Sequence, residues 1–368
     1  MSIRSAILLL ILLPIWIISF GGCTPDRPKT VADPGPANSR AKNALPDPFD
    51  FEEPEITVAA VGDMMFARRV AIHMDSTGYD APLGELSEQL AAFDITTGNL
   101  ECPVGRIGSP MDKKYVFRAD PAIIPQLAES GFDVLCVANN HAFDYGLPCF
   151  LGGLDLLRFG GIEPVGGGRN LAHALTPVYL ERGGKIFGFL AFNDTGTNFI
   201  GSSNPACAPA YDEWVFEAAE SAAENCDVLI VHLHWGREYL PYPTERQTTL
   251  GRALIDRGAD VVLGHHPHRW EGIEFYAGGL IAYSLGNFVF DQNDLANNLS
   301  GVLELTFRGS ELATVSVRPV EMLTSPRETH PASPPEFGIF EGILRESCAD
   351  FPTAITRDRD RLILNNTP

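Results

Sequence analysis

The apolar positions of the central chain follow two different periods. Short apolar runs at 56–61, 134–138 and 261–263 are each followed by polar residues and predict buried strands. Between such runs, segments 121–130 and 147–159 carry apolar residues at helical spacing and predict helices. Strands that alternate with helices indicate an α/β domain whose sheet is mostly buried.

Towards the C-terminus the pattern changes to alternation of single apolar and polar residues. Segments 301–307 and 313–320 alternate on either side of a turn at 308–310, and they predict a hairpin that completes or caps the sheet. We expect a loop at 324–335 and a terminal helix at 337–351. The residues after that helix are expected to be frayed.

The first residues predict export and a membrane anchor. An apolar run at 6–20 follows a short positive start and precedes Gly21, Gly22 and Cys23, which resembles a bacterial lipoprotein signal over 1–23. In this interpretation Cys23 becomes a lipidated N-terminus on the periplasmic or cell-surface face. The alternative is an uncleaved N-terminal membrane anchor. Residues 24–55 are rich in Pro, Asp, Ala and Asn and predict a flexible linker.

Charge and composition narrow the classes of partner. The chain has 368 residues, 45% of them apolar, which is enough for a sizeable core. Its 47 acidic and 27 basic residues give a formal net charge of −20, without a basic block. This balance argues against nucleic-acid binding, which requires clustered Lys and Arg. An anionic substrate stays compatible with it, because a bound metal ion reverses the local field.

Polar residues gather where five predicted strands end, at 56–61, 95–97, 134–138, 228–234 and 261–263. They are Asp63; Asn99 and Glu101; Asn140 and His141; His232 and His234; and His266 and His268. The carboxyl ends of parallel strands share one edge of a sheet, where α/β proteins bind ligands. Each of these residues has an ordinary alternative, as a turn former, a solvated side chain or a locally bonded imidazole. Their coincidence at five strand ends predicts one shared site.

The chemistry of this residue set favours a divalent metal ion. Carboxylate and imidazole ligands without a thiolate suit manganese, zinc or iron, and the number of ions stays open. His232 and His234 are two apart in a strand, so both point to one face. His141, beside Asn140, is a candidate general acid rather than a ligand. Gly264 is predicted to end its strand and to allow a sharp turn before His266.

Six motifs resemble, in the same order, those of the CapA family, the bacterial capsule or poly-γ-glutamate synthesis proteins. They are Gly62-Asp63-Met64-Met65, Gly98-Asn99-Leu100-Glu101, Ala138-Asn139-Asn140-His141, His232-Leu233-His234-Trp235-Gly236, His266-Pro267-His268 and Tyr283-Ser284-Leu285-Gly286-Asn287-Phe288. The CapA domain is similar in turn to calcineurin-like metallophosphatases. The resemblance implies a four-layer α-β-β-α sandwich at 56–320 with a dinuclear metal site, followed by a C-terminal extension at 321–368.

The resemblance also implies a role for each motif residue. By position, Asp63 is a ligand carboxylate, and Asn140 is a ligand or a catalytic residue that binds a substrate oxygen. His141 is the catalytic histidine, and His232 or His234 is a ligand. His266 and His268 are the paired ligands, and His265 is a bystander. Two positions depart from the metallophosphatase pattern. Met65 stands where that pattern has a histidine, and Asn99 replaces the bridging aspartate, with Glu101 as a potential substitute. A single-metal or altered site is therefore expected.

Three functional hypotheses follow from the resemblance. The first is a membrane-tethered, extracytoplasmic CapA-like protein of capsule or poly-γ-glutamate biosynthesis. It acts on an anionic or capsular polymer, beside membrane components of a synthesis complex. Its candidate chemistry is metal-dependent hydrolysis. The second is a non-catalytic component that binds polymer or partner proteins in the same crevice. The third is an exported metal-dependent phosphoesterase. Metal content separates the first and third hypotheses from the second.

Overall fold

The computed structural model of the chain describes residues 53–196, 206–325 and 327–367. The predicted signal at 1–23, with Cys23, and nearly all of the predicted linker at 24–55 lie outside these residues. In the described ranges, no helix is long and apolar enough to cross a membrane.

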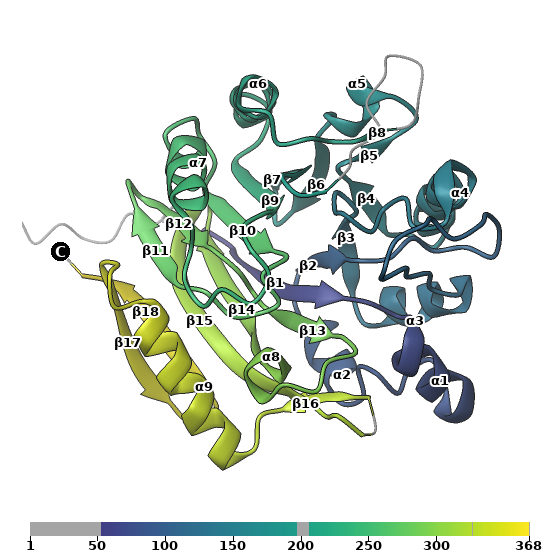
Figure 1. Ribbon diagram of the computed structural model, residues 1–368. Coiled ribbons are helices and arrows are strands. Elements are labelled where there is room, and N and C mark those ends of the chain that lie inside the picture. The colour runs from purple at the N-terminus through teal and green to yellow at the C-terminus, as the bar shows by residue number, and fades with distance from the viewer. Residues whose placement is uncertain (1–52, 197–205, 326, 368) are drawn as a thin grey trace, which may run out of the picture. The chain divides into compact units, whose positions relative to one another are not determined.

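A ten-stranded sheet forms one half of the domain (Figure 1). Its strands, in spatial order, are β17 (Thr353–Asp358), β18 (Arg361–Asn366), β15 (Glu311–Met322), β14 (Leu299–Arg308), β1 (Glu55–Met64), β2 (Ile95–Leu100), β3 (Phe132–Cys136) and β4 (Glu163–Val165), with β13 (Asn287–Val289) on β1 and β16 (Thr329–Pro331) on β15. Strands β1 to β4 run parallel, whereas β14 joins β1 antiparallel. The parallel half therefore delivers its carboxyl ends to one edge.

A six-stranded sheet forms the other half. In spatial order it contains β11 (Ile273–Tyr276), β12 (Gly279–Ala282), β10 (Val261–His265), β9 (Val228–His234), β7 (Lys185–Asn193) and β6 (Val178–Arg182). Strands β12, β10, β9 and β7 are parallel. A short separate pair, β5 (Gly167–Gly168) and β8 (Ala206–Cys207), lies outside both sheets.

Helices cover the outer face of each sheet, and the two inner faces pack together. The helices are α1 (Arg68–Thr77), α2 (Leu86–Leu90), η1 (Pro121–Ile123), α3 (Ile124–Glu129), α4 (Gly146–Phe159), α5 (Leu171–Ala174), α6 (Asp212–Ala223), α7 (Glu245–Ile255), α8 (Leu295–Asn298) and α9 (Pro334–Ser347). One buried cluster joins apolar residues of β1, β2 and β14 to those of β7, β9 and β10. A second cluster joins the opposite face of β9 and β10 to α6 and α7.

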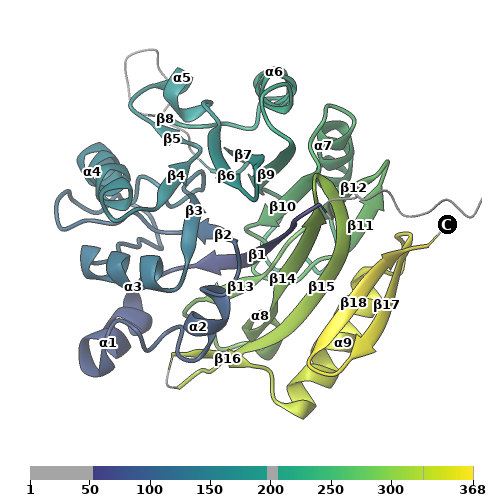
Figure 2. The same ribbon diagram turned by 180° about the vertical axis from the view of Figure 1, so that it is seen from behind.

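The order of the parallel strands explains where these helices lie. Strands β1, β2, β3 and β4 are neighbours in sequence order, so right-handed crossovers place α2, α3 and α4 on one face. The same rule places α6 and α7 on one face of the smaller sheet, as the views from opposite sides show (Figures 1 and 2). The predicted four-layer α-β-β-α sandwich is confirmed.

Two expectations for the C-terminal region are wrong. The residues after α9 are not frayed, because β17 and β18 form a hairpin whose β18 pairs with β15. The predicted loop at 324–335 contains β16, which also pairs with β15. Leu362 and Leu364 alternate with less buried residues and lie in the core, but a run this short carries a weak signal. Pairing with a distant strand decides its structure.

Shortening one core side chain of the hairpin tests its contribution to stability. Leu362 is fully buried opposite Val317 of β15. Leu362→Ala is expected to lower the free energy of unfolding by about 2–4 kcal/mol, since truncation leaves a cavity. Urea unfolding followed by tryptophan fluorescence measures the change. The exposed neighbour Asn365 supplies the control, because Asn365→Ala should stay within about 0.5 kcal/mol. Equal stability of both variants would mean that β18 adds nothing.

Candidate metal centre

Two neighbouring strands place carboxylates at the edge where the sheets meet. Asp63 lies near the end of β1, in register with Asn99 of β2. Glu101 follows β2 directly, and its backbone N–H donates to the Met64 carbonyl oxygen at 2.8 Å. Asp63, Asn99 and Glu101 are all fully buried. The parallel pairing of β1 with β2 therefore brings acidic groups from distant parts of the sequence together.

The smaller sheet adds imidazoles to the same edge. His234 ends β9 and is in register with His265 of β10. Asp63, Glu101 and His234 each offer a ligand atom, and these three atoms lie within 4.8 Å of one another. Within the part of the chain that the structure describes, this is the group that has the composition and spacing of a metal site. It joins both sheets.

Glu101 shows that these residues fit a cation. Both of its carboxylate oxygens are buried and have no hydrogen-bond partner among the described residues. The nearest imidazole nitrogens, Nε2 of His141 and Nε2 of His268, are each 3.8 Å from Oε1. A buried carboxyl group without hydrogen-bond partners is costly, and native proteins pair such groups or use them as metal ligands. Two carboxylates with imidazoles suit a divalent ion of the zinc, manganese or iron type.

The two carboxyl groups differ in charge state. Burial raises the pKa of Asp63, but hydrogen bonds and electrostatic interactions with His265 and His268 outweigh it, and the pKa falls well below its usual value. The Nδ1 atoms of both histidines lie 3.4 Å from the Asp63 carboxylate. Burial, and then the Asp63 charge, raise the pKa of Glu101 well above its usual value. The negative charge of the pair therefore resides on Asp63, and a cation favours ionisation of both.

The loop after β10 adopts a strained backbone to reach the site. His266 and His268 have φ values of 96° and 57°, a region that non-glycine residues rarely adopt. The His266 N–H donates to Asp63 Oδ2 at 3.1 Å, and Asn287 Oδ1 lies 2.9 Å from His268 Nδ1. The His266 ring is centred 4.8 Å from that of His234. Both predicted ligands of this loop therefore border the carboxylate pair.

Gly264 does not have the predicted role. It lies inside β10, and the turn is made by His266 and His268. A Cβ atom on Gly264 would be 1.9 Å from the Tyr283 carbonyl oxygen. Close approach of the 283–285 segment, rather than a turn, therefore requires glycine here.

A chain of amides determines how Asn99 faces the site. The Leu100 carbonyl oxygen accepts from Asn139 Nδ2 at 2.9 Å, so the amide nitrogen of Asn139 must point that way. The same nitrogen donates to Asn99 Oδ1 at 3.1 Å. Asn99 Nδ2 therefore faces the site and donates to Asp63 Oδ1 at 2.8 Å. Asn99 holds Asp63 in place instead of offering an oxygen to an ion.

The remaining predicted histidines have different surroundings. His232 lies below the site, with Nε2 3.0 Å from Thr97 Oγ1 and Nδ1 3.0 Å from His265 Nε2. Both of its ring nitrogens therefore have protein partners. His265 connects His232 to Asp63 and is a buried contact of the site. His234 Nε2 lies 3.0 Å from Asn140 Oδ1, so a metal bound at that nitrogen would replace this contact.

His141 belongs to a network that the sequence analysis missed. Its Nδ1 lies 2.7 Å from Asp144 Oδ2, and Lys113 forms an ion pair with the other oxygen of Asp144. The Phe117 ring stacks on the imidazole with centroids 4.1 Å apart. Burial lowers the pKa of His141, although Asp144 opposes the shift. Asp144 orients the ring so that Nε2 faces Glu101, and its position three residues after His141 was the available signal.

Met65 does not take over the role of a ligand histidine at its position. Its side chain is fully buried, and its sulfur accepts the Ala67 N–H at 3.2 Å. A thioether is a soft ligand that suits few of the ions favoured by carboxylates. Position 65 therefore adds no nitrogen ligand to this edge.

Comparison with known proteins identifies the family. Residues 57–292 match the family described as bacterial capsule synthesis protein PGA_cap, and this range includes every predicted site residue. The chain belongs to the PGA_cap family. It is 32% identical to the PGA biosynthesis protein CapA of Bacillus subtilis, over 76% of this chain and 75% of that protein. It is 31% identical to the capsule biosynthesis protein CapA of Bacillus anthracis, over 74% and 68%.

A solved structure is similar in part to this PGA_cap chain. It is a hypothetical protein from Thermus thermophilus, with 18% identity, a TM-score of 0.44, and coverage of 72% of this chain and 99% of that chain. The family comparison, rather than this structural likeness, confirms the resemblance to the capsule synthesis family.

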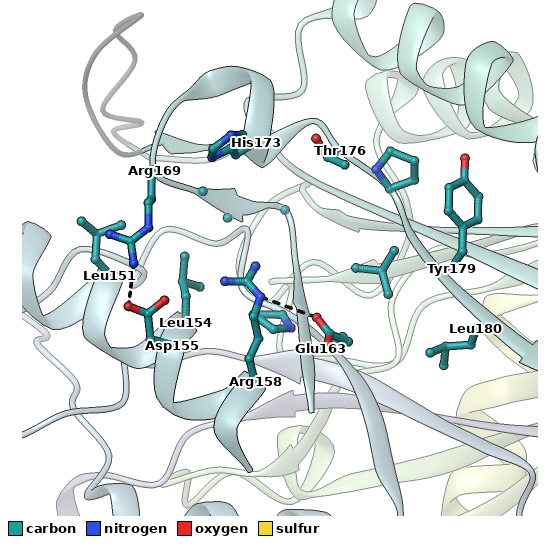
Figure 3. Close-up of a pocket in the computed structure, with 16 residues that line it drawn as sticks. Leu151, Leu154, Asp155, Arg158, Glu163, Arg169, His173, Thr176, Tyr179 and Leu180 are labelled. Atoms are coloured by element: carbon teal, nitrogen blue, oxygen red, sulfur yellow. Dashed lines mark hydrogen bonds and ion pairs between the residues drawn. The ribbon is translucent and has the colours of Figure 1, made fainter. Parts of the chain in front are cut away.

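A larger cavity of this PGA_cap chain lies away from the candidate metal centre. It has a volume of about 580 Å³ between α4, the β4–β5 segment and β6. Arg169 pairs with Asp155 at 2.7 Å and Arg158 with Glu163 at 3.6 Å along its wall (Figure 3). None of the predicted site residues lines it. The metal centre instead adjoins a cavity of about 270 Å³ lined by His141 and His268.

Proposed function

We propose that this protein serves in the production of a capsular polymer of the poly-γ-glutamate type, through a divalent metal centre. Two relatives are named for PGA biosynthesis and for capsule biosynthesis, which supports the polymer. The observation that carries the metal proposal is the buried carboxyl group of Glu101, which has no hydrogen-bond partner among the described residues and lies beside Asp63 and His234.

Each residue of the centre has a distinct task in this proposal. Asp63, Glu101 and His234 hold the ion, and His266, His268 and Asn140 complete its surroundings. A bound divalent ion supplies a Lewis acid and a water of lowered pKa for hydrolysis. His141 moves a proton at Nε2 while Asp144 holds Nδ1. Met65 and Asn99 remove one imidazole and one negative charge, which favours a single ion.

The location in this proposal comes from the N-terminal sequence. A lipid on Cys23 anchors the exported chain to the membrane, and residues 24–55 separate the anchor from the domain. The polymer is anionic, and the membrane components of a capsule synthesis complex are the proposed protein partners. The same departures at Met65 and Asn99 favour a second candidate, a component that binds polymer without cleaving it.

Metal analysis combined with polymer production tests the proposal. The purified full-length protein should carry about one transition-metal ion per chain by inductively coupled plasma mass spectrometry. His234→Ala should lose this metal and, placed in the source bacterium, should abolish surface polymer. His173→Ala changes a histidine on the distant cavity and should alter neither result.

The possible results separate the candidates. Metal at background in the unmodified protein would refute the metal centre. If the unmodified protein carries the metal but His234→Ala cells still produce polymer normally, the metal centre has no role in polymer production. Polymer that is absent from cells without the protein but normal in His234→Ala cells would favour the binding component.

A further inference from the structure

Arginine side chains gather at the opening of the metal centre. The cavity of about 270 Å³ that His141 and His268 line is also lined by Arg68 and Arg69. The two arginine side chains are 41% and 47% exposed, so their charged groups reach solvent. A ligand in this cavity therefore lies beside two guanidinium groups.

These arginines belong to a cluster with excess positive charge. The fully buried carboxylate of Asp291 lies 3.2 Å from Arg68 Nε, 2.7 Å from Arg69 Nε and 3.4 Å from Arg327 Nη2. Three guanidinium groups against one carboxylate leave two positive charges in excess. This concentration is unusual for a chain with a net charge of −20.

Acidic residues at the cavity do not cancel this excess. Asp294 lies 3.5 Å from Arg269, so this carboxylate has its own arginine. Glu238 also lines the cavity, and the positive charge of Lys114 lies near it. The region around Arg68 and Arg69 therefore stays positive.

Helix α1 begins in a way that local stability does not favour. Its N-cap is Ala67, which has no capping oxygen, and its first turn contains no acidic residue. Arg68 and Arg69 instead place positive charge at the positive end of the helix dipole. Arg68 also has a φ of 55°, a strained value for a residue with a side chain. The missing cap, the unfavourable charges and the strained φ occur together at the start of this helix, and such a combination is typical of a functional site.

An aromatic side chain supports the exposed guanidinium group. The Arg68 Cζ atom lies 5.7 Å from the centre of the Tyr115 ring, within the range of a cation–π contact. Tyr115 lines the same cavity. A guanidinium held against a ring keeps its outer N–H groups available for a planar anion, at a lower entropy cost than a mobile arginine.

We infer that Arg68 and Arg69 form a binding subsite for the carboxylate groups of the anionic polymer, next to the metal centre. The inference rests on the proposed function for the identity of the polymer. Guanidinium groups bind both carboxylates and phosphates. In this cluster they already bind a carboxylate, that of Asp291. The subsite holds the polymer by its charged groups and positions its backbone towards His141 and His268.

Binding of a defined oligomer tests the subsite. The probe is a fluorescein-labelled decamer of γ-linked glutamate, added to the purified full-length protein, with fluorescence anisotropy as the readout. Arg68→Ala should raise the dissociation constant roughly ten- to a hundredfold, the usual effect of losing a charge-assisted hydrogen bond. Arg68→Lys should recover part of the affinity, because lysine keeps the positive charge but lacks the paired N–H donors of the guanidinium group. Arg169→Ala, on the distant cavity, should change it less than twofold.

Further measurements keep folding and ligand identity separate from binding. Asp291 retains Arg69 and Arg327 in Arg68→Ala, so this variant should keep the metal content and melting temperature of the unmodified protein. A decamer with amidated carboxylates should not bind. Binding of the glutamate decamer that is unchanged in the Arg68→Ala, Arg69→Ala double variant would overturn the inference. Binding of inorganic phosphate without any binding of the decamer would overturn its assignment to carboxylates.

The inference and the proposed function fail separately. Metal-free protein that binds the decamer through Arg68 would refute the metal centre and retain the subsite. If the protein carries metal but Arg68→Ala leaves the affinity for the decamer unchanged, the metal centre is retained and the subsite is refuted.

Discussion

Glu101→Gln is expected to reduce bound metal to background while leaving the metal-free protein as stable as before. The amide lacks the negative charge that a divalent ion requires, and Glu101 is one of the donors that lie within 4.8 Å of one another. In the metal-free protein the same substitution removes a buried carboxyl group that has no hydrogen-bond partner among the described residues, so little stability is lost. Mass spectrometry of metal content and urea unfolding in excess chelator measure the two effects.

Glu271 provides a matched control for this prediction. It is also a fully buried glutamate, and its Oε1 has no hydrogen-bond partner within the ranges that the structure describes. Its other oxygen accepts from Gln247 Nε2 at 2.7 Å, and it does not belong to the group around Asp63. Glu271→Gln should therefore keep the metal. Equal metal content in the two variants would rule out Glu101 as a ligand.

Gly264→Ala is expected to prevent folding or to lower the free energy of unfolding by more than about 4 kcal/mol. The added Cβ atom would be 1.9 Å from the Tyr283 carbonyl oxygen and 2.7 Å from Trp235 Nε1. The Leu285 N–H donates to the Gly264 carbonyl oxygen at 3.0 Å, so neither backbone segment can move without breaking this contact. Yield of soluble protein and thermal unfolding by circular dichroism measure the effect.

A second glycine substitution serves as the control, because the loss of this glycine is expected to be harmless. Gly152 lies inside helix α4, and a Cβ atom there meets nothing within 4 Å. Gly152→Ala should raise stability by about 0.5–1 kcal/mol, because alanine is the better helix former. If Gly264→Ala behaved in the same way, the close packing of β10 against the 283–285 segment would be refuted.

Much of the fold could be predicted because its signals are local. The helix predicted at 147–159 corresponds to α4, Gly146–Phe159, and the hairpin predicted around 308–310 corresponds to β14 and β15. The polar residues at strand ends also converge as expected, since parallel strands share an edge. The C-terminal hairpin was missed because its strands are stabilised by β15 rather than by their own pattern.

The details of the site could not be predicted, because they depend on contacts between distant segments. Spacing alone places His232 and His234 on one face of a strand, and it does not show that His232 contacts Thr97 and His265. The direction of the Asn99 amide follows from Asn139 and the Leu100 carbonyl group. Hydrophobic periodicity carries no information about such choices.

The sequence by itself determined the α/β class, the residues that gather at the strand ends and the family to which they point. Periodicity and motif order are properties of the sequence itself, so they can be recognised without the tertiary structure. Only the tertiary structure decided that Glu101 lies buried near His141 and His268 without a hydrogen-bond partner among the described residues. It also decided that Arg68, Arg69 and Arg327 surround Asp291. Glu101 meets His268 because the two sheets pack face to face, whereas the arginines meet Asp291 because β1, β13 and β16 belong to one sheet. Both arrangements depend on long-range packing, which a one-dimensional pattern leaves undetermined.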